Sequence, residues 1–558
     1  MNRLARALAA GLALLVLAGC AQLPQSGPVK DGPDLQKGQS SDYLYYSPNG
    51  PEAGQSQGDI LNGFINAATG PQNDFAVARE FLTPNMGANW APNTEVLIQQ
   101  GGLNTQLNPN NKASVTLTVA ASIDSSGHYS ALPAGTQRTL DFTFAKYNGQ
   151  WRISSAPNAV VLIRPVFDVI YHSYSLYFFD HGFNYLVPDL RWFPSRTSTA
   201  TRLVAALLEG PSDWLAGAVE TTMPLDTKLA IDAVTVDKDV AQVDLNAIAL
   251  QAPQSRRQYF KAQLLATLRQ VTGVNKVQVL IERSSQKIAD YVPANSASRA
   301  IAPVVLSQGA LRQLASPTSS QLSSAETYIE ELGANQFALT ADQRTVALRN
   351  QTGVWQVHLG QAGERPVLID GRSDMLDPKY DKRGSLWTIS RNGDGLIQVK
   401  PAVGSPHWLQ APWLVGHKVL DFALSAEGSR IVTVVQTGGG RSQILVAAVV
   451  RNRTGVPTSI GYPIRLRIDS GNPRSIDWSG ENQLIALIKD AAGNAQVINF
   501  SIGGDSKTLG PIANGVRVVS GDSASNVYVI TASGNLVQYR GYAWSVLARK
   551  VTAAHMVN

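Results

Sequence analysis

The first clear pattern in the chain is a run of apolar residues near its beginning. Arg3 and Arg6 come before the run, which extends from Leu8 to Leu17, and small residues follow it. A basic start, a short apolar segment and small residues after it are the layout of a secretory signal peptide. The run is too short to span a bilayer, which needs about 20 apolar residues. We therefore predict a signal peptide over residues 1–19 and export of the remaining chain.

Within residues 58–165, apolar residues first recur at the spacing of a helix and then alternate with polar residues as in a strand. Asp59 or Gly58 is the predicted N-cap of a first helix, and Asp74 is the predicted N-cap of a second helix that Pro84 ends. Apolar and polar residues then alternate, as in strands with one buried face, at residues 115–119, 140–144 and 147–153. Two helices on a curved antiparallel sheet that ends in Asn-Gly-x-Trp-Arg-Ile resemble an α+β domain of the NTF2-like kind. Before it, the breaker pairs of residues 20–57 predict a tether.

Residues 166–290 combine helices and strands in another order. Thr199 or Thr201 is the predicted cap of a helix that Gly210 and Pro211 stop. Two strands joined by an Asp-Lys-Asp turn, a long helix and a final strand follow, at residues 231–236, 241–245, 259–268 and 277–281. This order, with Met-Pro-Leu between the first helix and the strands, resembles the GerMN domain of spore germination proteins and implies an α/β fold.

The C-terminal part of the chain repeats a polar turn followed by an apolar strand. The strands after five such turns begin 40, 45, 53 and 43 residues apart, at Val346, Leu386, Ile431, Leu484 and Val527. Blades of four short strands recur every 40–50 residues or so, which predicts an all-β propeller over residues 336–558. The turn Trp-Ser-x-x-x-x-Leu-Ile-Ala from Trp478 resembles that of TolB-type propellers. Five blades are visible, and residues 291–335 are either a linker or part of a sixth blade.

Composition narrows the classes of function. Hydrophobic residues make up 44% of the chain, enough to fill large cores, whereas charged residues make up only 16%, against about 25% in average proteins. The formal net charge is +6, but no basic run is interleaved with aromatic residues, which argues against nucleic-acid binding. No apolar stretch of membrane-spanning length follows the signal peptide. We expect several exported globular domains with no membrane attachment beyond the N-terminus.

Cys20 is the single cysteine of the chain and stands directly after the predicted signal peptide. Leu17-Ala18-Gly19-Cys20 resembles a bacterial lipobox at all four positions. The resemblance implies that the sulfur of Cys20 carries a diacylglyceryl group and that Cys20, N-acylated after cleavage, is the first mature residue. Two acyl chains hold a protein at a membrane where one chain is marginal. The expected location is the extracytoplasmic face of the cell membrane, through this lipid anchor.

Common motifs of catalysis and metal binding are missing from the sequence. It contains no Gly-x-Ser-x-Gly nucleophile elbow and no His-Glu-x-x-His zinc motif. The histidines do not cluster at metal-ligand spacing; they are His128, His172, His181, His358, His407, His417 and His555. We therefore expect a protein that is not an enzyme, with no catalytic residue, no metal and no cofactor.

Four local features favour structural roles. Arg191 and Trp192 are interpreted as a packed corner or a cation–π pair at a domain entrance. His172 and His181 flank a strand-like segment, which favours ordinary packing. The glycine run 438–440 lies between two strands and predicts a hairpin tip rather than a phosphate-binding loop. One acidic cluster lacks the spacing of a calcium loop and predicts a solvated loop between blades; it consists of Asp370, Asp374, Asp377 and Asp381.

The order of these parts along the chain resembles the actinobacterial LpqB lipoprotein family. Lipobox, tether, NTF2-like domain, GerMN-like domain and propeller follow one another, and Leu186–Pro194 reads Leu-Val-Pro-Asp-Leu-Arg-Trp-Phe-Pro before the GerMN-like helix. The resemblance implies an extracytoplasmic accessory of the MtrAB two-component system, which contacts the sensor histidine kinase MtrB and modulates its signalling, with consequences for cell-wall metabolism and division. It transfers no binding residue other than Cys20.

Two other functions stay open on the sequence alone. The propeller can bind a cell-wall glycan or wall precursor directly, as a sensor or scaffold. Paired carboxylates from distant blades can also form the active site of a wall hydrolase or esterase without a local motif. A glycan pull-down without kinase binding favours the first alternative, and substrate turnover that depends on these carboxylates favours the second.

Overall fold

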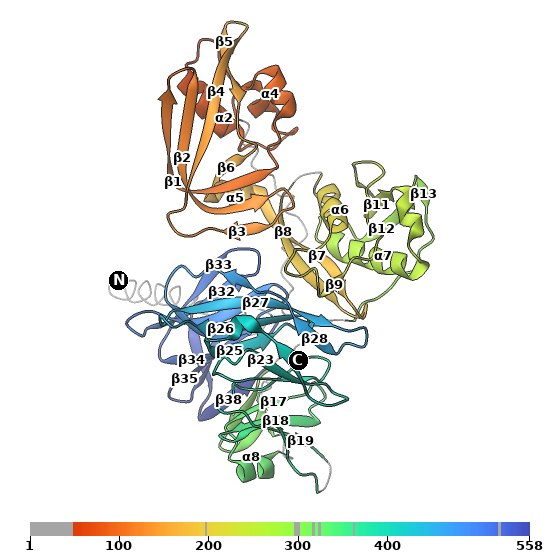
Figure 1. The fold of residues 1–558 in the computed structure, drawn as a ribbon, viewed down its shortest axis with the longest axis vertical. Helices are drawn as coiled ribbons and strands as arrows, with labels where there is room; N and C mark the ends of the chain where they lie inside the picture. The colour runs from red at the N-terminus through yellow and green to blue at the C-terminus, as the bar shows by residue number, and fades with distance from the viewer. Residues whose placement is uncertain are drawn as a thin grey trace, which may run out of the picture. The chain divides into compact units, whose positions relative to one another are not determined.

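The computed structural model describes residues 48–195, 198–294, 302–314, 319–321, 325–360, 363–522 and 526–557. Cys20, the predicted signal peptide and most of the predicted tether lie outside the described residues. Asn49–Asn558 forms one compact unit (Figure 1). No helix within the described ranges is both long and apolar enough to cross a membrane.

The first domain of this unit is a six-stranded sheet with short helices packed on it, as expected for an α+β domain of the NTF2-like kind. The strand order is β5-β4-β2-β1-β6 with β3 beside β2, and all pairs are antiparallel except β1–β6. The helices are α2 (Gln57–Ala67), α3 (Ala76–Glu80), α4 (Pro84–Asn89) and α5 (Arg164–Ile170). The strands are β1 (Glu95–Asn108), β2 (Lys112–Asp124), β3 (Tyr129–Ala131), β4 (Gln137–Tyr147), β5 (Gln150–Ser155) and β6 (Val160–Ile163).

The core of this domain follows from the alternation along its strands. In β2 every second residue from Ala113 to Ile123 is buried, because successive side chains of a strand point to opposite faces. The buried face meets the aromatic residues of the helical layer. The Phe64 ring of α2 lies 5.0 Å from the Trp90 ring and 6.1 Å from the Phe142 ring of β4, centre to centre. The predicted strands therefore create the face on which the helices pack.

The helix ends of the first domain differ from the prediction. Ser56 caps α2: its hydroxyl accepts from the Asp59 amide, and the Asp59 carboxylate accepts from the Ser56 amide, so Asp59 completes a capping box and is not the N-cap. Asp74 does not cap α3 either, because Phe75 occupies the N-cap position in a left-handed conformation. Pro84 begins α4 instead of ending the preceding helix, since the first turn of a helix leaves its N–H groups unbonded and proline has none.

The second domain contains two small sheets and two main helices. The antiparallel sheet β8-β7-β9 consists of β7 (Tyr171–Asp180), β8 (Leu186–Pro194) and β9 (Val219–Glu220). In the sheet β10-β11-β12-β13, the parallel pair β11–β12 is connected through α7, as a βαβ unit requires. The remaining elements are α6 (Thr199–Glu209), β10 (Thr235–Asp237), β11 (Val240–Leu245), η1 (Ala247–Gln251), α7 (Gln254–Leu268), β12 (Lys276–Ile281) and β13 (Ser284–Ser285). The expected α/β fold is present.

Two local predictions for the second domain were wrong. The strand expected over residues 231–236 is confined to β10, because the preceding turn is already bonded to the end of β11 through the Ala230 amide and the Asp244 carbonyl. Neither Thr199 nor Thr201 caps α6, since both lie inside the helix, which begins after Ser198.

The C-terminal domain is a β-propeller. Its described residues form six antiparallel sheets of four strands, one of which is extended by β29. The five strand starts predicted from the repeat all lie in the second strand of a sheet. Five sheets are continuous in the chain: β17 (Gln336–Leu339), β18 (Thr345–Asn350), β19 (Gly353–His358), β20 (Val367–Asp370); β21 (Lys379–Tyr380), β22 (Leu386–Ile389), β23 (Leu396–Lys400), β24 (His407–Gln410); β25 (Lys418–Leu424), β26 (Arg430–Gln436), β27 (Ser442–Arg451), β28 (Pro457–Ile460) with β29 (Ile464–Leu466); β30 (Asn472–Trp478), β31 (Gln483–Lys489), β32 (Ala495–Ser501), β33 (Ser506–Ile512); and β34 (Gly515–Ser520), β35 (Val527–Thr531), β36 (Leu536–Tyr539), β37 (Trp544–Ala548).

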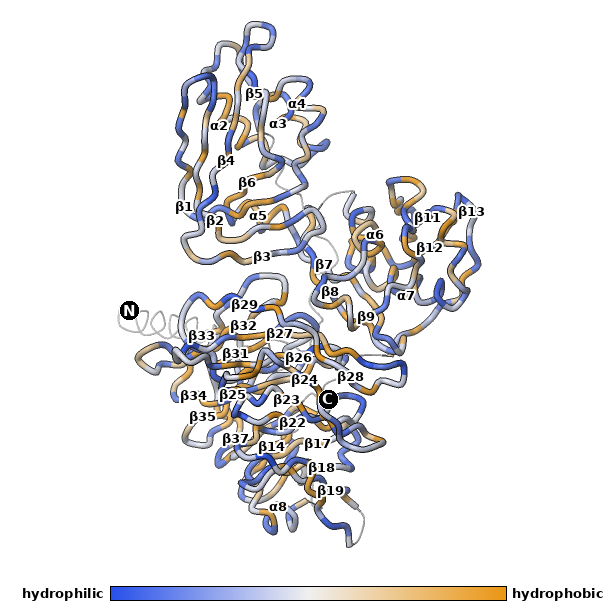
Figure 2. The backbone as a smooth tube through the Cα atoms, in the orientation of Figure 1, coloured by the Kyte–Doolittle hydropathy of each residue, from blue (hydrophilic) through white to orange (hydrophobic). Residues whose placement is uncertain are grey.

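The sixth blade is built from both ends of the propeller. β14 (Val304–Ser307), β15 (Ala310–Leu314) and β16 (Ser319–Gln321) precede the other blades, and β38 (Val551–His555) follows them. β14 pairs with β38, so the last strand closes the ring. Of the two blade numbers left open by the sequence, the structure has six. α8 (Glu326–Leu332) and the short helix η2 (Pro412–Leu414) lie in connections. Figure 2 shows apolar positions concentrated along the propeller strands, where β26 and β31 are buried almost throughout.

Candidate functional site

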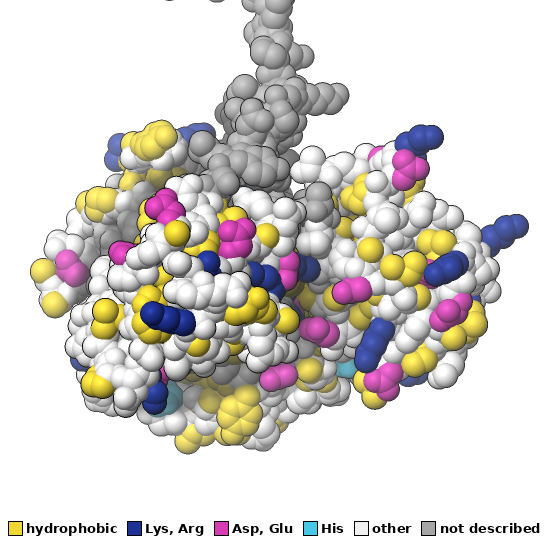
Figure 3. Space-filling model, turned by 90° about the horizontal axis from the view of Figure 1, so that it is seen from above, with side chains coloured by type: hydrophobic (Ala, Val, Ile, Leu, Met, Phe, Trp, Pro, Cys, Tyr) yellow, Lys and Arg dark blue, Asp and Glu magenta, His cyan; other side chains and the backbone are white. Residues whose placement is uncertain are grey.

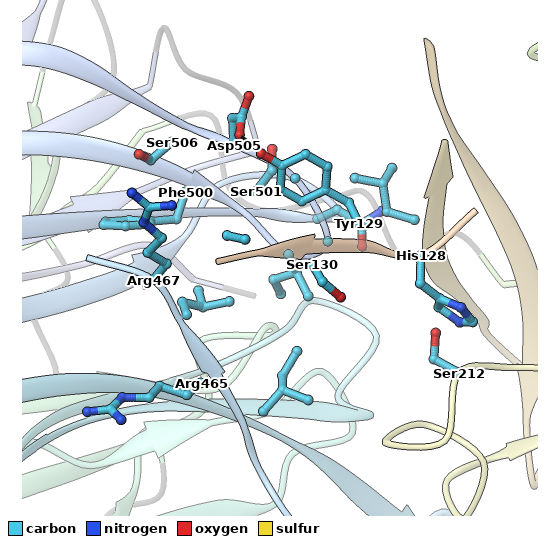
Figure 4. A pocket seen from close by; sticks show the side chains of 18 of the residues that line it. His128, Tyr129, Ser130, Ser212, Arg465, Arg467, Phe500, Ser501, Asp505 and Ser506 are labelled. Carbon is cyan, nitrogen blue, oxygen red and sulfur yellow. Dashed lines mark hydrogen bonds between the residues drawn. The ribbon is translucent and has the colours of Figure 1, made fainter. Parts of the chain in front are cut away.

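A cleft of about 1070 Å³ lies where the three domains of the compact unit meet (Figure 4). Side chains of both charges line it. The main lining segments are residues 128–131 of the first domain, 188–190 and 211–214 of the second, and 464–469 and 500–506 of the propeller. Small-molecule pockets of about 300–1,000 Å³ occur preferentially at domain interfaces. The cleft is therefore the candidate binding site of this chain.

His128 lies at one edge of the cleft, in the turn after β2. Its Nδ1 is 2.8 Å from Oδ2 of Asp124, whose Oδ1 accepts from the backbone amides of His128 and Ser126. Burial alone raises the pKa of Asp124, but the hydrogen bonds from His128 and Ser126 outweigh it and lower the pKa. The Nε2 of His128 is buried and has no hydrogen-bond partner among the described residues. This nitrogen is an unsatisfied polar atom beside the cleft.

Tyr129 joins the first domain to the propeller. Its hydroxyl donates to the carboxylate of Asp505, which also forms an ion pair with Arg164 at the start of α5. Arg164 pairs in turn with Asp168, with 2.7 Å between Nε and Oδ1. Burial raises the pKa of Tyr129 and outweighs the charge of Arg164, which lowers it. The hydroxyl therefore stays protonated and can donate. These bonded side chains therefore join the first domain to the propeller at one side of the cleft.

Two arginines of the propeller line the same cleft with different degrees of constraint. Arg467 donates to the backbone carbonyls of Ala120, at 2.9 Å, and of Leu132, and pairs with Asp469 at 2.8 Å. Arg465 is exposed and makes no side-chain hydrogen bond or ion pair within the described part of the chain. Arg467 therefore holds the domains together, whereas Arg465 presents a charge that is available for binding.

Arg191 and Trp192 form the packed corner that the sequence predicts. The Arg191 guanidinium is buried and pairs with Asp189 at 2.7 Å. The Trp192 indole donates from Nε1 to the carbonyl of Gly503 in the propeller, at 2.8 Å, and its ring lies 5.2 Å from that of Phe167. Their role is to position the three domains around the cleft.

The prediction of a solvated loop for the acidic cluster was wrong. Three of the four carboxylates are buried in ion pairs with arginines, and the fourth is about half exposed. The pairs are Asp370–Arg372 (2.7 Å), Asp381–Arg451 (2.7 Å), Asp377–Arg349 (3.4 Å), Asp377–Arg517 and Asp374–Arg391 (3.2 Å). Several partners belong to other sheets of the propeller, so no local spacing shows them.

The other candidate features lie apart from the cleft. Within the described ranges, no group of three or more His, Cys, Asp or Glu residues is placed to hold a metal ion. The glycine run 438–440 lies at the tip of the β26–β27 hairpin, as predicted. His172 is exposed, so the prediction of ordinary packing was wrong for it, whereas His181 is partly buried and forms an ion pair inside the fold.

His181 is held between two acceptors in the second domain. Its Nδ1 lies 2.8 Å from Oε1 of Glu220, and its Nε2 lies 3.1 Å from the carbonyl oxygen of Gly217. Because neither acceptor can donate, only the doubly protonated ring satisfies both contacts. Burial alone lowers the pKa of His181, but the contacts with Glu220 and Gly217 outweigh it and raise the pKa. Burial alone raises the pKa of Glu220, but the hydrogen bonds and charges of His181 and Arg256 outweigh it and lower the pKa.

Glu220→Gln is expected to lower the pKa of His181 toward its ordinary value of about 6.5. In the native chain the stabilisation from protonated His181 is complete below that pH and is lost as the pH rises through the raised pKa of the folded state. Titration of the histidine ring carbons by NMR measures this shift. Glu331→Gln removes an equal charge from an exposed site in α8 and is the control. A His181 titration unchanged by Glu220→Gln contradicts the assignment.

Sequence reasoning missed the residues that line the cleft. Asp505 lies more than 300 residues after Tyr129 and Arg164 in the chain, and each residue alone is unremarkable in its local pattern. One signal was present: Arg465, Arg467 and Asp469 alternate with apolar residues, which is typical of a strand with one polar face. This alternation marks a charged strand face but does not show which domain it meets.

The folds define a multidomain protein in which an α+β domain and an α/β domain precede a six-bladed propeller. The family models agree with this architecture. "Lipoprotein LpqB, N-terminal domain" matches residues 50–168, "Sporulation and spore germination" matches residues 175–287, and "Lipoprotein LpqB beta-propeller domain" matches residues 312–555. The chain belongs to the LpqB lipoprotein family, as the sequence resemblance predicts.

Relatives match this chain over most of its length. Lipoprotein LpqB of Thermobifida fusca is 25% identical over 91% of this chain and 91% of the relative. Lipoprotein LpqB of Streptomyces coelicolor is 25% identical over 94% of this chain and 93% of the relative. Lipoprotein LpqB of Bifidobacterium longum is 27% identical over 81% of this chain and 80% of the relative. The similarity therefore extends across all three described domains.

Solved structures show weaker likenesses. TolB from Acinetobacter baumannii is 13% identical, with a TM-score of 0.33, over 58% of this chain and 81% of that chain. The first GerMN domain of the sporulation protein GerM from Bacillus subtilis is 23% identical, with a TM-score of 0.19, over 22% and 94%. The fold assignments rest on the observed sheets and the family models rather than on these likenesses.

Proposed function

We propose that this chain is a lipid-anchored extracytoplasmic protein that binds a sensor histidine kinase of the MtrB type and modulates its signalling, with effects on cell-wall metabolism and division. Membership of a family whose relatives are named lipoproteins carries the proposal. The lipobox residues up to Cys20 support the anchor. The interdomain cleft supports binding of a partner rather than catalysis.

The chemistry of the cleft suits a polar segment of another protein. Most of its charged groups are already engaged in domain-joining contacts, as for Arg164, Asp505 and Arg467, so they fix the shape of the site. Arg465, which is exposed and has no side-chain partner among the described residues, remains for the partner. Figure 3 shows acidic and basic side chains interspersed over the face that it views.

Anchoring makes a modest affinity sufficient. A tether that holds both proteins at one membrane surface raises their effective concentration. A micromolar contact, about −8 kcal/mol, is then mostly occupied. Preferential binding to one signalling state of the kinase shifts the populations of its states, which is the modulation we propose.

Capture from membranes tests this function. The anchored chain is expected to retain the kinase ectodomain, and Arg465→Glu is expected to weaken that retention at least about tenfold, because it places a repulsive charge in the cleft. Binding of the purified chain to the purified ectodomain is measured in parallel. Arg549→Glu makes the same charge change at an exposed position of the propeller and is the matched control.

The anchor is tested in the same experiment by Cys20→Ala. This variant is expected to leave the membrane fraction and to weaken signalling, while binding of the purified proteins persists. Unchanged signalling from a fully released chain removes tethering from the mechanism. Retention of a wall glycan without any retention of the kinase contradicts the proposed partner.

A further inference from the structure

A second pocket, on the axis of the propeller, is independent of the cleft and of the proposed function. It has a volume of about 310 Å³ and is lined by the first strands of the sheets and their neighbours. We name it the axial pocket. It is lined by Gln336, Arg349, Asp377, Arg391, Leu420, Asp421, Arg474, Ser475, Val516, Arg517, Ile530 and Thr552. The axial pocket is separate from the cleft: it includes Arg474 near the beginning of β30, whereas the cleft includes Asn482, which follows the end of that strand.

Four strands of the propeller present side chains to this pocket through the same irregularity. The register of β25, β30, β34 and β38 shifts by one residue, which leaves one extra residue in each strand. The extra residues are Leu420, Arg474, Val516 and Thr552, and all four line the axial pocket. A β-bulge redirects a side chain and is common beside functional sites. Its recurrence around one axis indicates a shaped site.

Positive charge exceeds negative charge in the axial pocket. Four guanidinium groups line it against the carboxylates of Asp377 and Asp421. Arg349 and Arg517 share Asp377, Arg517 also pairs with Asp421 at 3.5 Å, and Arg391 pairs with the more exposed Asp374. No hydrogen bond or ion pair of the Arg474 side chain is found among the described residues. Arg474 is therefore a cation without a counter-ion.

The remaining groups show the same imbalance. The Nε of Arg349 is buried and lies 3.4 Å from Oδ1 of Asp377, in an ion pair but without a hydrogen bond in the described ranges. Burial and the charge of Arg391 lower the pKa of Arg349, and burial and the charge of Arg349 lower the pKa of Arg517 to about 10. Burial also raises the pKa of Asp421. The arginines repel one another, and an anion between them relieves that repulsion.

We propose that the axial pocket binds a small phosphate-bearing anion. Guanidinium groups bind phosphate oxygens through paired, charge-assisted hydrogen bonds. The donors converge from several sheets, so a tetrahedral group with oxygens in several directions satisfies them better than a planar carboxylate does. The volume of the pocket admits a free phosphate, a pyrophosphate or a small phosphate ester. A bilayer surface cannot enter it, so we commit to the free anion rather than to a lipid headgroup.

Calorimetric titration of the purified full chain with inorganic pyrophosphate at low ionic strength tests this proposal. We expect saturable binding at one site, and Arg474→Gln should weaken it at least about tenfold, because a charge-assisted contact is lost. Arg474 has no partner among the residues that the structure describes, so the variant is expected to fold, and its thermal unfolding midpoint verifies this. Val516→Glu, at a partly exposed position of the same pocket, should also abolish binding.

Controls separate a built site from general attraction. Arg441→Gln removes one charge from an exposed position of the β26–β27 hairpin and should leave the affinity unchanged. An equal loss in both arginine variants, or no saturable binding by the folded native chain, overturns the proposal. Vesicles containing phosphatidylglycerol form a separate arm. Arg474-dependent binding to vesicles without binding of pyrophosphate also overturns it. None of these outcomes bears on the kinase, which is measured separately.

Discussion

Deletion of residues 551–558 is expected to abolish the cooperative unfolding transition of the propeller. The deleted segment contains β38, the partner of β14 in the sixth blade, and its Val551, Met556 and Val557 are buried. Each such side chain contributes about 1.5–3 kcal/mol on burial. Their loss, together with the newly exposed edge of β14, approaches the whole stability of a typical domain, about 5–15 kcal/mol. Urea unfolding of the full chain, followed by tryptophan fluorescence, measures the effect.

The comparison that isolates ring closure is deletion of Asn558 alone, which leaves β38 intact and should not change the unfolding midpoint. Ala553→Glu provides a milder test, because it introduces a charge at a buried position of β38 without removing its backbone. We expect a lower midpoint with a transition still visible. A chain lacking residues 551–558 that unfolds at the native urea concentration shows that the propeller does not depend on this closure.

Periodic patterns predicted the parts of the fold that local sequence determines. The propeller was predictable because each blade repeats a polar turn before its second strand, as at Ile431 and Leu484. Blade number was ambiguous because the sixth sheet is split between the two ends of the domain. Helix boundaries failed where two residues compete for one role: at α2, Ser56 is the N-cap and Asp59 its reciprocal partner.

The candidate sites could not be predicted in the same way, because they depend on contacts between distant segments. Tyr129 and Asp505 meet only after the first domain docks on the propeller. Three of the four arginines of the axial pocket are ordinary strand residues in sequence, and Arg474 is the extra residue of the bulge in β30. A bulge adds a single residue, which interrupts the alternation of buried and exposed side chains along the strand, so the sequence pattern does not show which side chains share a face.

Arg430→Met is expected to lower the free energy of unfolding by about 3–5 kcal/mol, because it leaves a carboxylate buried without its partner. Arg430 is fully buried, pairs with Glu427 at 2.8 Å and donates to the carbonyl of Glu481 at 2.6 Å. Its guanidinium also lies 4.7 Å from the centre of the Trp478 ring. It thereby links two blades of the propeller, and the change should be visible in urea unfolding at neutral pH.

The pH dependence distinguishes a lost ion pair from a simple packing defect. Burial alone raises the pKa of Glu427, but the charge and hydrogen bonds of Arg430 outweigh it and lower the pKa. In the native chain this stabilisation is present above the ordinary pKa of about 4.3 and is lost as the pH falls through the lowered pKa. Without Arg430 the pKa of Glu427 rises above its ordinary value, so the deficit of Arg430→Met should shrink on acidification, as Glu427 takes up a proton.

A double variant and a surface variant complete the test of Arg430. Arg430→Met combined with Glu427→Met should recover much of the lost stability, since replacing both members of a buried pair with apolar side chains is often nearly neutral. Arg441→Met, at an exposed position of the β26–β27 hairpin, should change stability by less than about 0.5 kcal/mol. If the double variant is as unstable as Arg430→Met, the bonds from Arg430 to Glu481 and Asn482 in the next blade, rather than neutralisation of Glu427, carry its contribution.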